Sequence, residues 1–207
     1  MNAEVARAEL ALARVDSVLA QLIASSGPCP IGNGRRHRTH FEALARSIVF
    51  QQLAGKAATA IWNRTQALVP GPFTPPAVLA VGADRLRTAG LSGSKAKALL
   101  DLADHVVRGD VRLSTIGRRT DDEIVAELSK VWGVGRWTAE MFLMFQLGRL
   151  DVWPVGDLGV RNGYGRAWRM PEAPGPAELE LLGERFRPWR SVVAWYCWRA
   201  ADAIPPA

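Results

Sequence analysis

Hydrophobic and polar residues recur at helical spacing along most of the chain. Between residues 4 and 24 the apolar positions share one side of a helix, which predicts a single amphipathic helix there. Residues 41–69 show the same periodicity, with a break between Gln51 and Gly55 that carries two adjacent glutamines. We therefore expect two helices joined by a short hinge in this second segment.

Two glycines separate a further pair of predicted helices in the second half of the chain. Thr120 with Glu123 fits a capping box at the start of TDDEIVAELSKVW, whose apolar residues recur at helical spacing. Gly133 and Gly135 follow, and glycine permits a tight turn and the close approach of another backbone. From Arg136 the pattern is helical again. The unpaired N–H groups at this second helix start would suit a phosphate, although an ordinary helical hairpin is the alternative.

The remaining segments add helices but no clear strand. LSGSKAKALLDLADHVVRG predicts an amphipathic helix capped by Ser94. Lys95 and Lys97 fall in its first turn, where the helix dipole disfavours cations, and either a bound phosphate or a solvated face would account for them. RLDVWPV comes nearest to strand alternation, but Pro154 argues against a strand. The whole pattern predicts an all-α fold with two helical lobes and a cleft.

Composition and charge narrow the class of protein. The chain has 207 residues, of which 48% are hydrophobic, as expected for a globular protein and not for a disordered one. Lys and Arg exceed Asp and Glu by 26 − 20 = 6, a modest basic excess that favours a polyanionic partner without requiring one. No apolar run reaches membrane-spanning length, and the N-terminus lacks the apolar core of a signal peptide. We expect a cytoplasmic protein without a membrane partner.

Cysteine and histidine give little support for a metal site. Cys29 and Cys197 lie far apart and form no CxxC spacing, so neither a disulfide framework nor a zinc site is predicted. His37 and His40 are three residues apart, but no acidic residue or further histidine accompanies them. A solvated basic loop is the simpler interpretation of that segment, and contact with a phosphate is the second.

Several motifs together resemble one family. VWGVGRWTAE, a following hydrophobic helix and WPVGD are similar to the helix-hairpin-helix base-excision DNA glycosylases. Three further stretches resemble the DNA-3-methyladenine glycosylase II branch, which removes alkylated bases: IVFQQLAGKAA at 48–58, AGLSGSKAKALLDLA at 89–103 and RPWRSVVAWYCWR at 187–199. The similarity runs in order from about residue 40 to 200.

The resemblance implies an architecture and a partner. It implies one helix-hairpin-helix glycosylase domain over residues 1–207, without a separate N-terminal domain, that binds double-stranded DNA containing damaged bases in a cleft. It also implies a monomer associated with the nucleoid. No cofactor is required, and two cysteines cannot form the four-cysteine iron–sulfur cluster that some relatives carry.

Asp157 is the candidate catalytic residue. In the resembled family the aspartate at this motif position is catalytic, although the PVGD of this chain lacks the second polar residue that many relatives show before it. An aspartate just before a helix is very often only an N-cap, and the two roles are compatible. Asp151 is a nearby carboxylate, but its place in the motif is wrong.

The residue at position 137 bears on the reaction type. Members of the superfamily that also cleave the strand carry a lysine in this helix, whose amine attacks C1′ and forms a Schiff base. This chain has Trp137 there, and Lys130 lies before the hairpin. The resemblance therefore implies a monofunctional glycosylase that uses water to release alkylated purines of the 3-methyladenine or 7-methylguanine type. A bifunctional glycosylase/lyase and a non-catalytic DNA-binding helix-hairpin-helix module are the alternatives.

The resemblance also assigns a base pocket and a wedge. Trp137 and Trp198 match positions that line the pocket, and Met141 takes a place that some relatives give to tyrosine. Gln52 aligns best with the side chain that fills the gap left by an extruded base, and Leu53 is the alternative wedge.

The hairpin supplies the candidate contacts to the DNA backbone. These are Gly133, Val134, Gly135 and Arg136. The resemblance further implies that the carbonyl groups of Val131 and Val134 hold a monovalent cation, Na⁺ or K⁺, that bridges to a phosphate. Two roles of Arg190 stay open, a structural ion pair or a group that orients the catalytic carboxylate.

Overall fold

The computed structural model describes residues 3–32, 38–53 and 55–202 of the chain. In these residues every regular element is a helix, and no strand is found. They form two compact units, one built from the described residues up to 32 together with those from 143 onward, the other from residues 38–142. The predicted all-α fold with two helical lobes is confirmed for this part of the chain.

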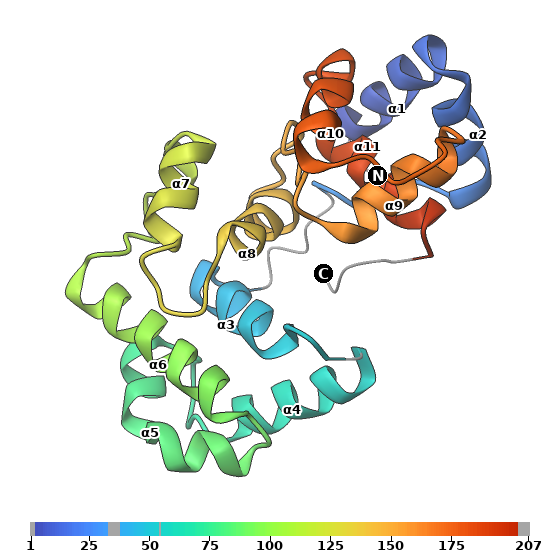
Figure 1. The fold of residues 1–207 in the computed structure, drawn as a ribbon. Helices are drawn as coiled ribbons and strands as arrows, with labels where there is room; N and C mark the ends of the chain where they lie inside the picture. Colours follow the sequence, from blue (N-terminus) through green and yellow to red (C-terminus); the bar gives the residue numbers. More distant parts are fainter. Residues whose placement is uncertain (1–2, 33–37, 54, 203–207) are drawn as a thin grey trace. The chain divides into compact units, whose positions relative to one another are not determined.

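The first unit combines the two ends of the chain. Its α-helices are α1 (Ala3–Val15), α2 (Ser17–Ser26), α9 (Leu158–Ala167), α10 (Pro176–Gly183) and α11 (Arg190–Ala200), with a 3-10 helix at Glu184–Phe186. Helix α11 packs against α1, α2 and α9 (Figure 1). Most of its side chains are buried, which makes α11 the central helix of this unit.

The single helix expected over residues 4–24 is wrong, because Asp16 divides it into α1 and α2. The Asp16 backbone is extended, and its Oδ1 accepts hydrogen bonds from the N–H groups of Val18 at 2.9 Å and Leu19 at 3.0 Å. An aspartate side chain competes in this way with the continuing helix. The apolar stripe carries across the break, so periodicity alone could not reveal it.

The second unit holds the middle of the chain. Its α-helices are α3 (His40–Phe50), α4 (Gly55–Ala67), α5 (Pro75–Thr88), α6 (Gly93–Arg108), α7 (Asp121–Leu128) and α8 (Arg136–Met141), with a 3-10 helix at Ile116–Arg118. Helix α6 packs along α5 and also contacts α3 (Figure 1). The predicted hinge between α3 and α4 is confirmed.

Capping residues explain where two of these helices begin. Thr120 and Glu123 form the predicted capping box of α7. The expected Ser94 cap of α6 is wrong, because Ser92 is the N-cap and its side chain accepts from the N–H of Lys95. An N-cap oxygen reaches the N–H two or three residues ahead, and Ser92 rather than Ser94 stands at that distance from the first unpaired donors of α6.

The segment after Gly135 is helical as predicted, but its hydrogen bonding changes along the way. Helix α8 passes into a π-helical stretch, Phe142–Gln146.

Within the first unit, α9 and α11 approach so closely that a Cβ at Gly163 would lie 1.8 Å from the carbonyl oxygen of Cys197. A glycine in α9 is therefore required by packing.

Candidate active site and DNA-binding elements

Asp157 is the N-cap of α9, as the sequence predicts. Its Oδ1 accepts hydrogen bonds from the backbone N–H of Val160 at 2.8 Å and from the indole Nε1 of Trp198 at 2.8 Å. The helix start and its dipole both stabilise negative charge at this position. The carboxylate is thereby held in one orientation by donors from α9 and α11.

The chain leading to Asp157 is fixed to the interior of the first unit. The N–H of Val152 donates to Ser191 Oγ at 2.8 Å, and the indole of Trp153 donates to the carbonyl of Leu179 at 2.8 Å. All four of these residues are buried. A functional carboxylate that is supported in this way keeps its geometry without help from a substrate.

Trp198 has a second role that the sequence did not reveal. The resemblance places it in the base pocket, but the structure shows that its ring is only 1% exposed. Its indole N–H donates to Asp157, and its ring lies 6.1 Å from that of Phe145 in a stacked orientation. Trp198 therefore positions the candidate catalytic carboxylate directly.

Gly159 is a site residue that sequence reasoning missed. A Cβ at this position would lie 2.9 Å from Trp198 Cδ1 and 3.0 Å from Asp157 Oδ1. Its conformation is an ordinary helical one, so no local signal distinguishes it from a helix-weakening glycine. Space for the contact between Asp157 and Trp198 is what requires glycine here.

Cys197 lies beside this contact and is fully buried. Burial raises the pKa of the Cys197 thiol, and the negative charge of Asp157 raises it further. The thiol consequently stays protonated and adds no competing charge to the site.

Asp151, the other carboxylate of this segment, is occupied by arginines. Arg190 Nε lies 2.8 Å from Asp151 Oδ1, and Arg187 Nη1 lies 2.6 Å from Asp151 Oδ2. Arg190 is only 7% exposed and also pairs with Glu180 and Glu184. Of the two roles left open for Arg190, the structural ion pair is the one observed, and it leaves Asp151 poorly suited to activate water.

The glycine hairpin of the second unit depends on one of its two glycines. Gly133 has φ = 78°, and a Cβ there would meet Ala98 Cβ at 3.2 Å. Gly135 is the N-cap of α8 with φ = −96°, and an added Cβ would meet nothing within 4 Å. The backbone thus requires glycine at position 133, whereas position 135 tolerates a side chain as far as the protein itself is concerned.

The hairpin is braced by neighbouring side chains. The N–H of Val134 donates to the carbonyl of Val131 at 3.0 Å and closes the turn. Asp101 Oδ2 accepts from the N–H of Trp132 at 2.7 Å. Lys97 Nζ lies 4.3 Å from the centre of the Trp132 ring, so a cation–π contact accounts for this lysine in the first turns of α6.

Arg136 and Trp137 start α8. Arg136 Nε pairs with Glu140 Oε1 at 2.9 Å, while its own side chain stays largely exposed. Trp137 is 36% exposed, and Met141, one turn further along, is buried. The structure places Trp137 and Met141 in the second unit, and Asp157 and Trp198 in the first.

The two wedge candidates lie in a tight turn after α3. The N–H of Leu53 donates to the carbonyl of Phe50 at 3.3 Å. Gln51 has φ = −50° and ψ = 131°, and Gln52 has φ = 54°, values that match a type II turn. That turn favours glycine where Gln52 stands, and the left-handed conformation costs roughly 1–2 kcal/mol for another residue. Gln52 and Leu53 are both exposed.

Neither a metal cluster nor a membrane span is found among the described residues. No group of three or more His, Cys, Asp or Glu could hold a metal ion there. His37 lies outside the described residues, and the His40 ring packs edge-on against Phe142 with centroids 5.6 Å apart. None of the described helices is both long and apolar enough to cross a membrane.

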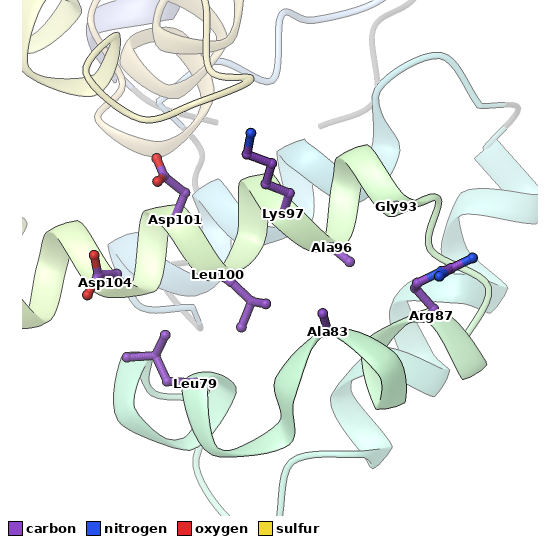
Figure 2. Close-up of a pocket in the computed structure, with 9 residues that line it drawn as sticks. All are labelled: Leu79, Ala83, Arg87, Gly93, Ala96, Lys97, Leu100, Asp101 and Asp104. Atoms are coloured by element: carbon purple, nitrogen blue, oxygen red, sulfur yellow. The ribbon is translucent and has the colours of Figure 1, made fainter.

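A groove of about 410 Å³ lies on the second unit between α5 and α6. Its apolar floor includes Leu79, Ala83 and Leu100 (Figure 2). Lys97 and Asp101, which brace the hairpin, also line this groove (Figure 2). No residue named for catalysis, the base pocket or the wedge lines this groove.

The second unit contains a helical hairpin with a glycine turn, and Asp157 caps a later helix. The sequence profile of the HhH-GPD superfamily base excision DNA repair protein matches residues 45–188, and the chain belongs to this family. The resemblance stated from the motifs is confirmed.

Individual relatives agree with this assignment. DNA-3-methyladenine glycosylase 1 of Schizosaccharomyces pombe is 32% identical over 198 residues, covering 94% of this chain and 87% of the relative. The structure of S. pombe 3-methyladenine DNA glycosylase Mag1 in complex with abasic DNA superposes with a TM-score of 0.83 at 31% identity, over 97% of this chain and 99% of that one. A DNA-3-methyladenine glycosidase from Bacillus halodurans gives a TM-score of 0.78 at 34% identity, over 92% and 86% of the two chains.

Proposed function

We propose that this protein is a monofunctional DNA glycosylase that removes alkylated purines, such as 3-methyladenine and 7-methylguanine, from duplex DNA in base excision repair. The observation that carries the proposal is the Asp157 carboxylate, held at the start of α9 by Trp198 and Val160. Membership of the HhH-GPD family and similarity to 3-methyladenine glycosylases support the substrate class.

The proposed reaction is hydrolysis of the N-glycosidic bond. A 3- or 7-alkylated purine carries positive charge, so it leaves with the bonding electrons as a neutral base and needs no protein acid. The sugar then develops oxocarbenium character at C1′, which the Asp157 carboxylate stabilises electrostatically. Water adds to C1′, and its proton passes to Asp157 or to solvent, which leaves an abasic site.

Hydrolysis is favoured over lyase chemistry by the residues of α8. A lyase needs an amine in this helix, and the chain has Trp137 and no lysine beyond Lys130. The same tryptophan is partly exposed, and we assign it, with Met141 on the same helix, to the pocket for a flipped base. A cationic base on an aromatic face gains roughly 0.5–2 kcal/mol, which favours charged lesions over neutral ones.

Contacts with DNA would come from two elements of the second unit. We assign the backbone contact to the hairpin from Gly133 to Arg136, with a Na⁺ or K⁺ ion on the carbonyls of Val131 and Val134. We assign the wedge to Gln52, with Leu53 beside it in the turn. The protein would act as a monomer on the nucleoid, without an iron–sulfur cluster or another required cofactor.

One experiment tests the proposal directly. The protein is incubated with a duplex that carries a single 7-methylguanine, free base is measured chromatographically, and alkali then reveals abasic sites as strand breaks. We expect the protein to release the base, and we expect strand breaks to appear only after the alkali treatment. Breaks without alkali, or a covalent adduct trapped by borohydride, would indicate a lyase. DNA binding without release of 7-methylguanine from this duplex, or of 3-methyladenine from a second methylated duplex, would indicate a non-catalytic module.

A further inference from the structure

The turn that carries Gln52 is held by side chains from other elements. Gln52 adopts a left-handed conformation in a type II turn although its side chain is exposed. An unfavourable conformation persists only where its surroundings determine it, and such positions cluster at functional sites. Contacts to the residues just before Gln52 show which side chains hold it in this conformation.

Lys95 clamps the beginning of the turn. Its Nζ donates to the carbonyl of Val49 at 2.7 Å and to the carbonyl of Gln51 at 2.6 Å. These carbonyls stand at the C-terminal end of α3, where a helix has unpaired acceptors and negative partial charge. This contact accounts for a cation at the start of α6 without a phosphate. Burial lowers the pKa of Lys95, which is the cost of taking the ammonium group out of water.

Gln51 ties the same turn to the hairpin. Its Nε2 donates to the carbonyl of Gly133 at 3.1 Å and to Thr138 Oγ1 at 3.1 Å. One amide therefore joins the end of α3 to the glycine turn and to α8. Both of its N–H donors are used within the second unit.

We infer that Lys95 and Gln51 are positioning residues that preset the turn carrying Gln52 and couple it to the hairpin, so that DNA gripped by the hairpin meets a wedge already in its inserting shape. This inference rests on the proposed function, in which Gln52 replaces an extruded base. A preset wedge lowers the ordering cost that would otherwise be added to the cost of unstacking.

The test uses variants of the full chain. Lys95→Met removes the ammonium group, Lys95→Arg restores the charge, and Gln51→Glu replaces both amide donors by an isosteric acceptor. Arg85→Met, on the exposed face of α5, controls for the loss of one cation. Gln21→Glu, exposed on α2, controls for a glutamine-to-glutamate change. Thermal unfolding of each variant is recorded first.

Two readouts separate positioning from folding. The first is fluorescence of 2-aminopurine beside a tetrahydrofuran abasic analogue, which rises when a wedge disturbs the stack and requires no base excision. The second is the single-turnover rate of 7-methylguanine release from a paired and from a mispaired site, because a mispaired base needs less help to leave the duplex.

We expect Lys95→Met and Gln51→Glu to lower the fluorescence rise at least threefold at saturating protein. They should slow 7-methylguanine release from the paired site at least tenfold and should slow release from the mispaired site by a smaller factor. Lys95→Arg should recover part of the loss, and both controls should behave as wild type. If either variant retains the wild-type fluorescence rise, or slows both sites equally, the inference is overturned and the clamp is structural only. If Lys95→Met does not fold, Gln51→Glu alone decides between these outcomes.

The proposed function can fail separately. A wild-type protein that releases no base but still disturbs 2-aminopurine beside the abasic analogue would refute the glycosylase while leaving the preset wedge testable. A wild-type protein that releases base without disturbing 2-aminopurine would refute the preset wedge and leave the glycosylase in place.

Discussion

The surroundings of Asp157 and the hairpin of the second unit are organised by different chemistry. Around Asp157, particular side chains make the contacts: Trp198 donates to the carboxylate, Ser191 fixes the preceding chain, and Arg190 neutralises Asp151. At the hairpin and the neighbouring turn, the positive φ of Gly133 and Gln52 shapes the backbone, and side chains such as Lys95 and Gln51 hold its carbonyl groups in place.

The difference fits the role proposed for each region. A carboxylate that stabilises charge at one carbon atom needs an exact position, which buried side-chain donors provide. A surface that holds a phosphate backbone of any sequence can use main-chain N–H and carbonyl groups, which every residue has. Substitutions around Asp157 should therefore slow base release from every site, whereas those at the hairpin and the turn should change DNA affinity or slow release mainly from paired sites.

Asp157→Asn should have the largest effect. The amide keeps the shape and the N-cap but removes the negative charge, so the single-turnover rate of base release should fall at least about a hundredfold. Thermal stability and affinity for an abasic analogue should stay near wild type. Release of 3-methyladenine at the wild-type rate would remove Asp157 from the mechanism.

Trp198→Phe should have the next largest effect. Phenylalanine preserves a ring near Phe145 but cannot donate to Asp157, and a hydrogen bond to a charged group contributes roughly 1.5–3 kcal/mol. We expect the rate of base release to fall at least about tenfold for charged and neutral lesions alike. Single-turnover kinetics on 7-methylguanine and hypoxanthine measure this.

Trp137→Ala serves as the matched comparison for that variant. Because Trp137 is the ring proposed to stack on a cationic base, its loss should slow 7-methylguanine release more than hypoxanthine release. Equal slowing of both lesions would argue against charge recognition by this ring.

Gly133→Ala and Gly135→Ala form a pair that separates folding from DNA binding. Alanine at position 133 would have to adopt positive φ against Ala98, which should lower the free energy of unfolding by about 1–2 kcal/mol. Alanine at position 135 meets open space, so stability should hardly change. If Gly135 approaches a phosphate, Gly135→Val should nevertheless weaken binding to every duplex equally in a salt titration. Normal binding by Gly135→Val would show that the hairpin is only a turn.

Gln52→Gly should have the smallest effect on base release among these variants and should change stability only slightly. Relief of the left-handed conformation, roughly 1–2 kcal/mol, is largely offset by the extra freedom of glycine in the unfolded chain, roughly 0.5–1 kcal/mol. Base release from a paired site should nevertheless slow, because no side chain remains to fill the gap. A faster or unchanged rate at unchanged stability would move the wedge to Leu53.

Local patterns made several features predictable. The capping box of α7, the hinge between α3 and α4, and the N-cap at Asp157 depend on residues within a few positions of one another, which the sequence displays directly. The division at Asp16 and the Ser92 cap of α6 are also local. The apolar stripe continues across Asp16, however, and near the start of α6 two serines, Ser92 and Ser94, could serve as the cap.

The sequence by itself determined the helical class, the order of the motifs and the family, because helical periodicity and motif spacing are one-dimensional properties. Only the tertiary structure decided that Trp198 donates to Asp157, that Lys95 caps α3, that Gln51 joins the turn to the hairpin, and that Gly159 must lack a side chain. These contacts join residues distant in sequence or depend on space that a partner helix occupies. No periodicity records which helices will be neighbours, and so these positioning groups become visible only when the chain is folded.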